Sequence, residues 1–557
     1  MNPALRAVSD LAPRGSDYAG LRSHWRKDLV AGLTVAVVAL PLALGFGISS
    51  GMSAEAGLIT AIIAGLVAAI FGGSSVQVSG PTGAMAVVLL PIVAQQGLGA
   101  VATVGIVAGL LVVLAGLLRL GRYLAYIPWP VIEGFTLGIA VIIFLQQVPA
   151  ALGVPRPEGE NTAVVAVRAI GDAAGEVQAA SILIVAVAAA VMWGSARLHR
   201  GIPGSLLAVV VGTLIAEWAG LDVARIGALP GSLPAPSLPS MEPGQFRGLL
   251  SAAVAVAALA AIESLLSAKV ADGMQDGRPH DPDRELLGQG MANIVAPLFG
   301  GMPATGAIAR TAVNVRSGAV TRMASIVHAL TLAVIVLVAA GLVARIPLAA
   351  LAGVLMMTAA RMVERHNIRA VLTSTRSDAL VLAATAAATV AFDLIVAIEI
   401  GMVVAAVLAL RMLARSARIE ETPIDAARPE LGHEREMALL DEHIVVYRLD
   451  GALFFGAAQR FLATLTETGE VRVVILRLPH LHMIDATGAQ TLGQVVENLE
   501  ERGITVLLKG PRPEHVPVLR AVGVLDRLAH DRHLFGDLDA AVAHARVHVT
   551  RALAGVA

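Results

Sequence analysis

The sequence contains no cysteine, few charged residues and few aromatic residues. The lack of cysteine excludes disulfide bonds, thiolate nucleophiles and metal sites with Cys ligands. Charged residues make up 15% of the chain, whereas about 25% is usual in soluble domains. Apolar residues dominate instead, because the hydrophobic fraction is 56% and the mean hydropathy is +0.75. This composition is typical of a polytopic membrane protein, and 557 residues leave room for many spans and a further domain.

The net charge and the N-terminal residues add two expectations about binding partners and location. The net charge of −1 gives no indication of nucleic-acid binding, and we expect none. Residues 1–28 are polar, and no apolar segment follows their first charges closely, as it would in a secretory signal peptide. We therefore expect residues 1–28 to form a cytosolic N-terminal leader.

Apolar segments of spanning length, about 20 residues, fill residues 29–413 as a transmembrane domain. The third and tenth segments are short and interrupted, so the interruption recurs seven segments later. This spacing predicts two seven-helix repeats, 29–219 and 248–413, and an odd number of spans inverts the second repeat. The fourteen expected segments are 29–47, 56–71, 81–95, 99–118, 128–148, 178–195, 202–219, 248–268, 285–299, 304–316, 322–343, 347–360, 378–393 and 395–413.

The distribution of Lys and Arg tests this segmentation. With the N-terminus inside, the inside connections hold nineteen basic residues and the outside connections hold five. This is the bias expected of cytoplasmic loops, so both termini are predicted to be cytosolic. The five outside residues are Arg156, Arg168, Arg225, Arg247 and Arg345.

The two interrupted segments read VSGPTGAMAVV (78–88) and GGMPATGAIART (300–311). A helix that begins inside the bilayer leaves its first N–H groups unpaired, and these groups and the positive helix end favour an anion. Thr82 would cap its helix or contact the substrate, and Thr305 holds the matching place in the second break. Two such starts in matching repeats predict a midplane binding site. The alternative is two ordinary kinked helices in which glycine only serves close packing.

Several motifs give the chain a strong resemblance to the sulfate permease family. They read DLVAGLTVAVVALPLALGFG, SGPTGAM, IESLLSAKVADGM and RELLGQGMANIVAPLFGGMPATGAIARTAVNVRSG. The resemblance implies a fourteen-helix inverted repeat with a core subdomain (segments one to four and eight to eleven) and a gate subdomain. It also implies that the anion lies between the two half-helix starts. Carried over by position, the contacts would come from Phe46, Thr82 and Gly83 on one side and from the backbone N–H groups of Gly306, Ala307 and Ile308 on the other.

Two charged residues lie near these breaks. Glu263 is in an apolar segment, where a carboxylate is costly and is expected to face the interior or a cavity. Acidic residues at this place bind a coupling sodium ion in some family members and are linked to protons in others, and we expect a proton here. The alternative is a structural hydrogen bond to a neighbouring helix. Arg310 lies one turn beyond Gly306, where it attracts the anion or pairs with an acid.

After Leu413 the composition changes to that of a soluble domain. A linker (414–436) precedes strands expected at 443–449, 471–478 and 504–510, and helices are expected between them at 457–467 and 488–503. Residues 437–550 are therefore predicted to form a small α/β domain. Its stretch LPHLHMIDATGAQTL resembles the STAS domain. In signalling relatives a hydroxyl at the place of Thr487 is phosphorylated, whereas in transporters the motif often serves only to begin a helix.

Other chemistry finds little support. No HExxH pattern or acid cluster indicates a catalytic metal, and no nucleophile–base set indicates an enzyme, so we expect neither metal nor cofactor. His328, within a span, is expected to be a satisfied core histidine. Capping, interfacial or salt-bridge roles are expected for Glu133, Glu217, Asp393 and Glu399.

The sequence therefore predicts a secondary active transporter of small anions such as sulfate, bicarbonate or C4-dicarboxylates, in the cell's inner membrane and driven by proton symport. The alternatives are a sodium-coupled bicarbonate symporter, an anion exchanger, a nucleobase permease of the same fold, and a membrane-anchored STAS signalling module. The resemblance also implies a homodimer, and a cytosolic protein partner is a further expectation for the STAS domain.

Overall fold

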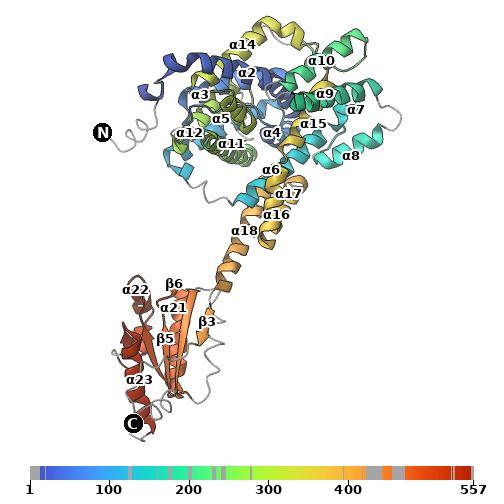
Figure 1. Cartoon of the computed structure of the whole chain (residues 1–557). Coiled ribbons are helices and arrows are strands. Elements are labelled where there is room, and N and C mark those ends of the chain that lie inside the picture. The colour runs from blue at the N-terminus through green and yellow to red at the C-terminus, as the bar shows by residue number, and fades with distance from the viewer. Residues whose placement is uncertain are drawn as a thin grey trace. The chain divides into compact units, whose positions relative to one another are not determined.

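The computed structural model divides into two compact units, Met1–Val403 and Val404–Ala557, and each is described by itself (Figure 1). The residues that the structure describes are 13–18, 20–122, 128–159, 161–173, 178–198, 203–228, 232, 234–239, 246–275, 279–392, 394–416, 418–421, 442–453, 471–528, 530 and 533–553.

The first repeat consists of helices joined by short connections. Side-chain caps explain several starts; for example, Ser53 accepts a hydrogen bond from the Ala56 N–H at the start of α3. After the short 3-10 helix η1 (Gly15–Tyr18), the helices are α2 (Leu21–Ser49), α3 (Ala54–Phe71), α4 (Gly83–Gln96), α5 (Leu98–Leu117), α6 (Trp129–Gln146), α7 (Val148–Leu152), α8 (Thr162–Asp172), α9 (Ala179–Leu198) and α10 (Gly204–Trp218).

The second repeat follows the same plan. Asp281 caps α12 and Thr375 caps α17 through their side-chain oxygens. The helices are α11 (Phe246–Met274), α12 (Pro282–Leu298), α13 (Ile308–Arg316), α14 (Met323–Val343), α15 (Leu348–Met362), α16 (Arg365–Ser374), α17 (Arg376–Ala391) and α18 (Leu394–Ser416).

Each of the fourteen expected segments coincides with a helix, and α7, α8 and α16 are additional short helices. Among the residues that the structure describes, seven helices are long and apolar enough to cross a membrane. The boundaries differ in two places. Helix α2 begins at Leu21, within the expected leader, and α13 begins only at Ile308, because 305–306 pair as a strand.

Close helix packing in this unit depends on glycine. Helix α12 packs against α3 and α5, and α14 packs against α2 and α3. A Cβ on Gly288 of α12 would lie 2.4 Å from Gly72 Cα, and a Cβ on Gly109 of α5 would lie 2.6 Å from the Gly290 carbonyl oxygen. The backbones therefore approach as closely as small residues permit, as in other membrane helix bundles.

The second unit contains a mostly parallel sheet with the strand order β3-β4-β5-β7-β8. Strand β3 is antiparallel to β4, whereas the other neighbours are parallel, and β6 pairs with β4. The elements are β3 (Arg418–Glu421), β4 (Ile444–Leu453), β5 (Val473–Arg477), β6 (Leu481–Ile484), α21 (Ala486–Glu501), β7 (Thr505–Lys509), α22 (Val516–Ala521), the 3-10 helix η3 (Leu525–Arg527), β8 (Leu534–Phe535) and α23 (Leu538–Leu553).

Two helices cover the two faces of this sheet. Leu492 and Val496 of α21 pack in one apolar cluster, and Ala541 and Ala545 of α23 pack in another, each with alternate residues of the strands. The three expected strands are confirmed as β4, β5 and β7. Strand β3 lies within the expected linker, and the helix expected over 457–467 lies outside the described residues.

Candidate functional site

The two interrupted segments meet as a short antiparallel ladder. Strand β1 (Ser79–Gly80) pairs with β2 (Thr305–Gly306), with Ser79 opposite Gly306 and Gly80 opposite Thr305. Helix α4 begins three residues after β1, and α13 begins two residues after β2. The ladder therefore brings the N-terminal ends of two half-helices from different repeats to one place.

Side chains of α12 hold this ladder in position. Asn293 donates to the Ala304 carbonyl oxygen at 2.9 Å and accepts from the Ala304 N–H at 2.8 Å. Gln289 donates from Nε2 to Ser79 Oγ at 2.5 Å. All four residues are buried, so these bonds satisfy backbone and side-chain groups that water does not reach.

Helix α4 begins with a side-chain cap. Thr82 Oγ1 accepts a hydrogen bond from the Met85 N–H at 3.4 Å. The N–H groups of Gly83 and Ala84 have no intrahelical acceptor, because they lie in the first turn. These two donors and the positive helix end face away from the helix, as an anion requires.

Helix α13 begins without a side-chain cap at Ala307. Its first intrahelical hydrogen bond runs from the Thr311 N–H to the Ala307 carbonyl oxygen at 2.8 Å. The N–H groups of Ile308, Ala309 and Arg310 therefore have no intrahelical acceptor. This second half-helix offers one more donor than the first and none of its donors is taken by a cap.

The structure corrects the donors expected in the second break. The Gly306 N–H donates to Ser264 Oγ at 2.9 Å, and the Ala307 N–H donates to the Val78 carbonyl oxygen at 2.9 Å. Neither N–H is therefore available for an anion in this conformation. The available donors lie slightly further along the chain, at the start of α13.

Two positions in the β1–β2 ladder favour glycine because neighbouring atoms already fill the space that a Cβ would take. A Cβ on Gly306 would lie 1.8 Å from Gln77 Nε2 and 3.0 Å from Ser264 Cα. A Cβ on Gly80 would lie 2.7 Å from Arg310 Nη1. The sequence motif therefore reflects close approach of side chains to the backbone as well as the start of a helix.

Phe46 lies close to the start of α4. A Cβ on Gly83 would lie 3.2 Å from Phe46 Cε1 and 2.2 Å from Ile143 Cδ1. Phe46 comes from α2 and Ile143 from α6, and both side chains are buried. The start of α4 is thus covered by apolar side chains of two further helices.

Glu263 connects the two breaks from α11. Its Oε2 accepts hydrogen bonds from Thr82 Oγ1 at 2.9 Å and from Thr305 Oγ1 at 2.8 Å, and the two hydroxyl oxygens lie 3.2 Å apart. Glu263 is partly buried, whereas both threonines are buried. The carboxylate therefore joins both repeats through one threonine from each.

Arg310 supplies a positive charge at the same place. Its side chain is 1% exposed, and Nη2 donates to the Pro81 carbonyl oxygen. Nη1 is buried and has no hydrogen-bond partner. Arg310 and Glu263 attract each other electrostatically. A buried guanidinium with an unused donor is costly unless a further acceptor arrives.

Two further polar side chains lie close to the β1–β2 ladder, and the sequence analysis missed one of them, Gln77. Gln77 and His328 are buried, and neither side chain has a hydrogen-bond partner for its nitrogen or oxygen atoms. The expectation that His328 is a satisfied core histidine is therefore wrong. Gln77 directly precedes the first interrupted segment, and Ser264 directly follows Glu263, so proximity to a motif was the only available signal.

The remaining acidic residues lie apart from this constellation. Glu133 accepts from Trp129 at 2.9 Å and from Asn367 at 3.0 Å, and Glu217 forms an ion pair with Arg225. Glu399 is exposed, and Asp393 lies outside the described residues.

Thr487 is exposed in the first turn of α21. The carboxylate of Asp485 caps this helix by accepting from the Gly488 N–H at 2.7 Å. The DATG stretch therefore begins a helix, as one of the two interpretations of the motif requires, and phosphorylation of Thr487 stays a prediction.

Comparison with known families matches both parts of the chain. A model described as the sulfate permease family matches residues 25–385, and a STAS domain model matches residues 437–541. The chain is 36% identical over 525 residues to "Putative sulfate transporter YvdB" of Bacillus subtilis, covering 92% of this chain and 97% of that protein. It is 33% identical over 504 residues to "Bicarbonate transporter BicA" of Synechocystis sp., covering 87% and 89%.

Solved structures agree with this match. The transmembrane domain of a cyanobacterium bicarbonate transporter BicA superposes with a TM-score of 0.62 at 36% identity, covering 67% of this chain and 97% of that chain. SLC26A9 superposes with a TM-score of 0.83 at 15% identity, covering 99% and 96%, which shows the shared fold. These likenesses confirm the expected fold class of two inverted helical repeats followed by an α/β STAS domain.

Proposed function

Because this chain belongs to the sulfate permease family of anion transporters and is not an enzyme, we propose that it is a secondary active symporter of small oxyanions. The substrates considered are sulfate, bicarbonate and C4-dicarboxylates, and the coupling ion is a proton carried by Glu263. Relatives named for sulfate and for bicarbonate transport support the oxyanion class. The membrane is the inner membrane of the cell, with both termini in the cytosol.

The unsatisfied guanidinium of Arg310 is the observation that carries this proposal. It is buried beside two half-helix starts whose first-turn N–H groups also lack intrahelical acceptors. An oxyanion offers several acceptor oxygens and a negative charge, so it complements all of these groups at once. A neutral nucleobase would bring no negative charge to these donors.

Glu263 explains how a proton would favour anion binding. When ionised, Glu263 accepts the hydroxyl hydrogens of Thr82 and Thr305 and balances the charge of Arg310. When protonated, it no longer repels an anion or offsets the charge of Arg310, and the two hydroxyls can donate to the anion instead. Proton and anion binding therefore reinforce each other, and this coupling is reciprocal.

Alternating access would move the core helices against the gate helices. The start of α4 contacts Ile143 of α6, which belongs to the gate in the expected division. The ladder of β1 and β2 ties α4 to α13, so both half-helices would move as one body carrying the anion.

Uptake into proteoliposomes tests this proposal. Labelled sulfate, bicarbonate and a C4-dicarboxylate are offered with an imposed pH gradient, with a sodium gradient, and with neither. We expect acid-stimulated uptake of at least one anion. Stimulation by sodium alone would replace the proton with sodium, and anion-for-anion exchange without either gradient would indicate an exchanger.

The Glu263→Gln variant isolates the coupling step. We expect it to lose acid stimulation while it retains anion binding, because glutamine keeps the size and polarity of protonated glutamate. The matched control is Glu399→Gln, which changes an exposed acid of α18. Unchanged acid stimulation in the Glu263→Gln variant would refute the proton assignment.

Orientation and assembly are part of the same proposal. The absence of native cysteine makes single-cysteine labelling unambiguous. A cysteine in place of exposed His480 should react with a membrane-impermeant reagent only from the cytosolic side.

Two further experiments test assembly and the role of the STAS domain. Cross-linking of intact membranes should give a homodimer. Transport by a chain truncated near Ala414 would separate transport from a signalling role of the STAS domain.

A further inference from the structure

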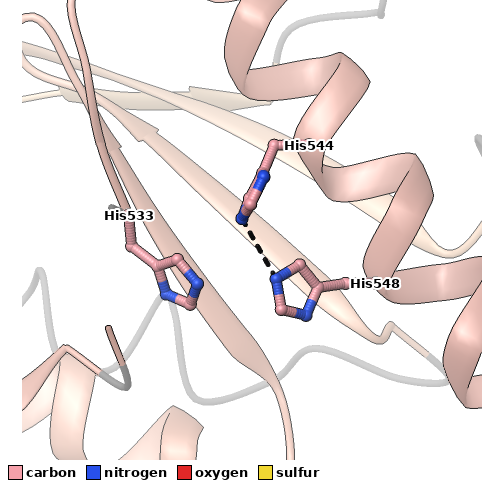
Figure 2. A group of neighbouring side chains, drawn as sticks. All are labelled: His533, His544 and His548. Atoms are coloured by element: carbon pink, nitrogen blue, oxygen red, sulfur yellow. Dashed lines mark hydrogen bonds between the residues drawn. The ribbon is translucent and has the colours of Figure 1, made fainter. Parts of the chain in front are cut away.

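Three histidines converge at one edge of the STAS domain. His544 and His548 lie on α23, and His533 immediately precedes β8. Each residue has one ring nitrogen that lies within 4.8 Å of a ring nitrogen of both other residues. Figure 2 shows that His544 and His548 project from the helix toward His533, which approaches from the other side.

The spacing of this group suits a metal ion. Residues at i and i+4 lie on the same face of a helix, so His544 and His548 present their rings together. Their Nε2 atoms are 3.2 Å apart. Two nitrogens bound to tetrahedral zinc at about 2.05 Å lie about 3.3 Å apart, so this pair already has the separation of two ligands.

The third ring completes a ligand set. His533 is 3% exposed, and its buried Nδ1 has no hydrogen-bond partner. The ring centroids of His533 lie 5.5 Å from His544 and 5.2 Å from His548. A small rotation of the His533 side chain would bring its nitrogen within bonding distance of an ion held by the other two.

Burial and neighbouring groups act on two of these rings, His533 and His548. Burial and the neighbouring His548, His544 and His530 lower the pKa of His533 to about 4. Burial, together with His544 and Arg551, also lowers the pKa of His548. Neutral imidazole is the form that binds metals.

We propose that His533, His544 and His548 form a binding site for one divalent transition-metal ion of the zinc class. Water or His530, whose ring centroid lies 6.1 Å from that of His533, would take the fourth position. The ion would fasten α23 to the segment that leads into β8, and α23 covers one face of the sheet. The STAS domain would thus contain a helix whose docking depends on metal.

Metal titration of the full-length protein tests this site. The protein is purified in detergent through a tag without histidine, stripped with a chelator, and titrated with zinc against a fluorescent chelator. We expect one tight site per chain and at least a hundredfold loss of affinity in the His544→Gln/His548→Gln variant. His533→Gln should lose about tenfold or more, whereas His480→Gln, an exposed histidine of the same domain, should bind as the native protein does.

Two further measurements keep the proposal falsifiable if a variant folds poorly. Cobalt bound to the native protein should show the intense visible absorption of a tetrahedral site. Zinc should also slow the hydrogen exchange of α23 amides in the native protein and in His480→Gln. Zinc binding of equal strength in native protein and double variant, or no effect of zinc on α23 exchange, would show that the histidines form only a hydrogen-bonded group.

Discussion

Helices α4 and α13 hold equivalent places in the two repeats, yet they begin differently. Thr82 caps α4 with its side chain, whereas Ala307, which precedes α13, provides no side-chain cap, and α13 carries Arg310 in its first turn. The first break therefore contributes the Thr82 hydroxyl and lies against the apolar side chains of Phe46 and Ile143. The second contributes the positive charge of Arg310 and more N–H groups without an intrahelical acceptor. A duplicated scaffold thus supports an asymmetric site.

Removal of the charge from the second break should have the largest effect. Arg310→Gln should reduce uptake in proteoliposomes by about a hundredfold, because hydrogen bonds to charged groups contribute about 1.5–3 kcal/mol each. Arg310→Lys should be intermediate, since it keeps the charge but not the planar guanidinium. Arg316→Gln at the exposed end of the same helix is the control and should transport normally. Equal uptake by Arg310→Gln and Arg316→Gln would contradict the assigned role of the second break.

Alanine substitutions of the glycines in the two breaks should have the second-largest effect on uptake, and the two breaks should differ. In Gly306→Ala the new methyl group meets Gln77 and the backbone at Ser264, which costs about 1–3 kcal/mol and about tenfold in uptake. In Gly83→Ala the methyl group meets the flexible end of Ile143, so the loss should be smaller. Ile143→Val added to Gly83→Ala should restore uptake. Thermal unfolding in detergent checks the stability of each variant, and a larger loss in Gly83→Ala would reverse the comparison.

Valine substitutions of the two threonines should have the smallest effects on stability and on uptake. Thr82→Val loses a helix cap and should reduce the free energy of unfolding by about 1 kcal/mol. Thr305→Val loses no cap, so it should change the pH dependence of uptake more than it changes stability. Thr82→Ser keeps the hydroxyl and serves as the control. Equal destabilisation by Thr82→Val and Thr305→Val would show that the cap contributes nothing measurable.

The sequence was sufficient to predict the helices because apolar length and glycine breaks are local signals. It also located Glu263 and Arg310, since charges within apolar segments are conspicuous. It could not predict which N–H groups remain available, because the partners of Gly306 and Ala307 come from α11 and from the segment before β1. Three separated histidines in the STAS domain escaped notice for the same reason: only folding brings them together.

The ladder between β1 and β2 also determines when the site can exist during synthesis. Thr82 and Thr305 are 223 residues apart, and Arg310 is 229 residues from Pro81. Such contacts close late, because a long loop must be ordered before they form. A chain that has inserted only its first repeat therefore lacks Thr305, Arg310 and the second half-helix of the proposed site. We therefore expect a chain that ends before the second break to bind no anion, because the proposed site needs residues from both repeats.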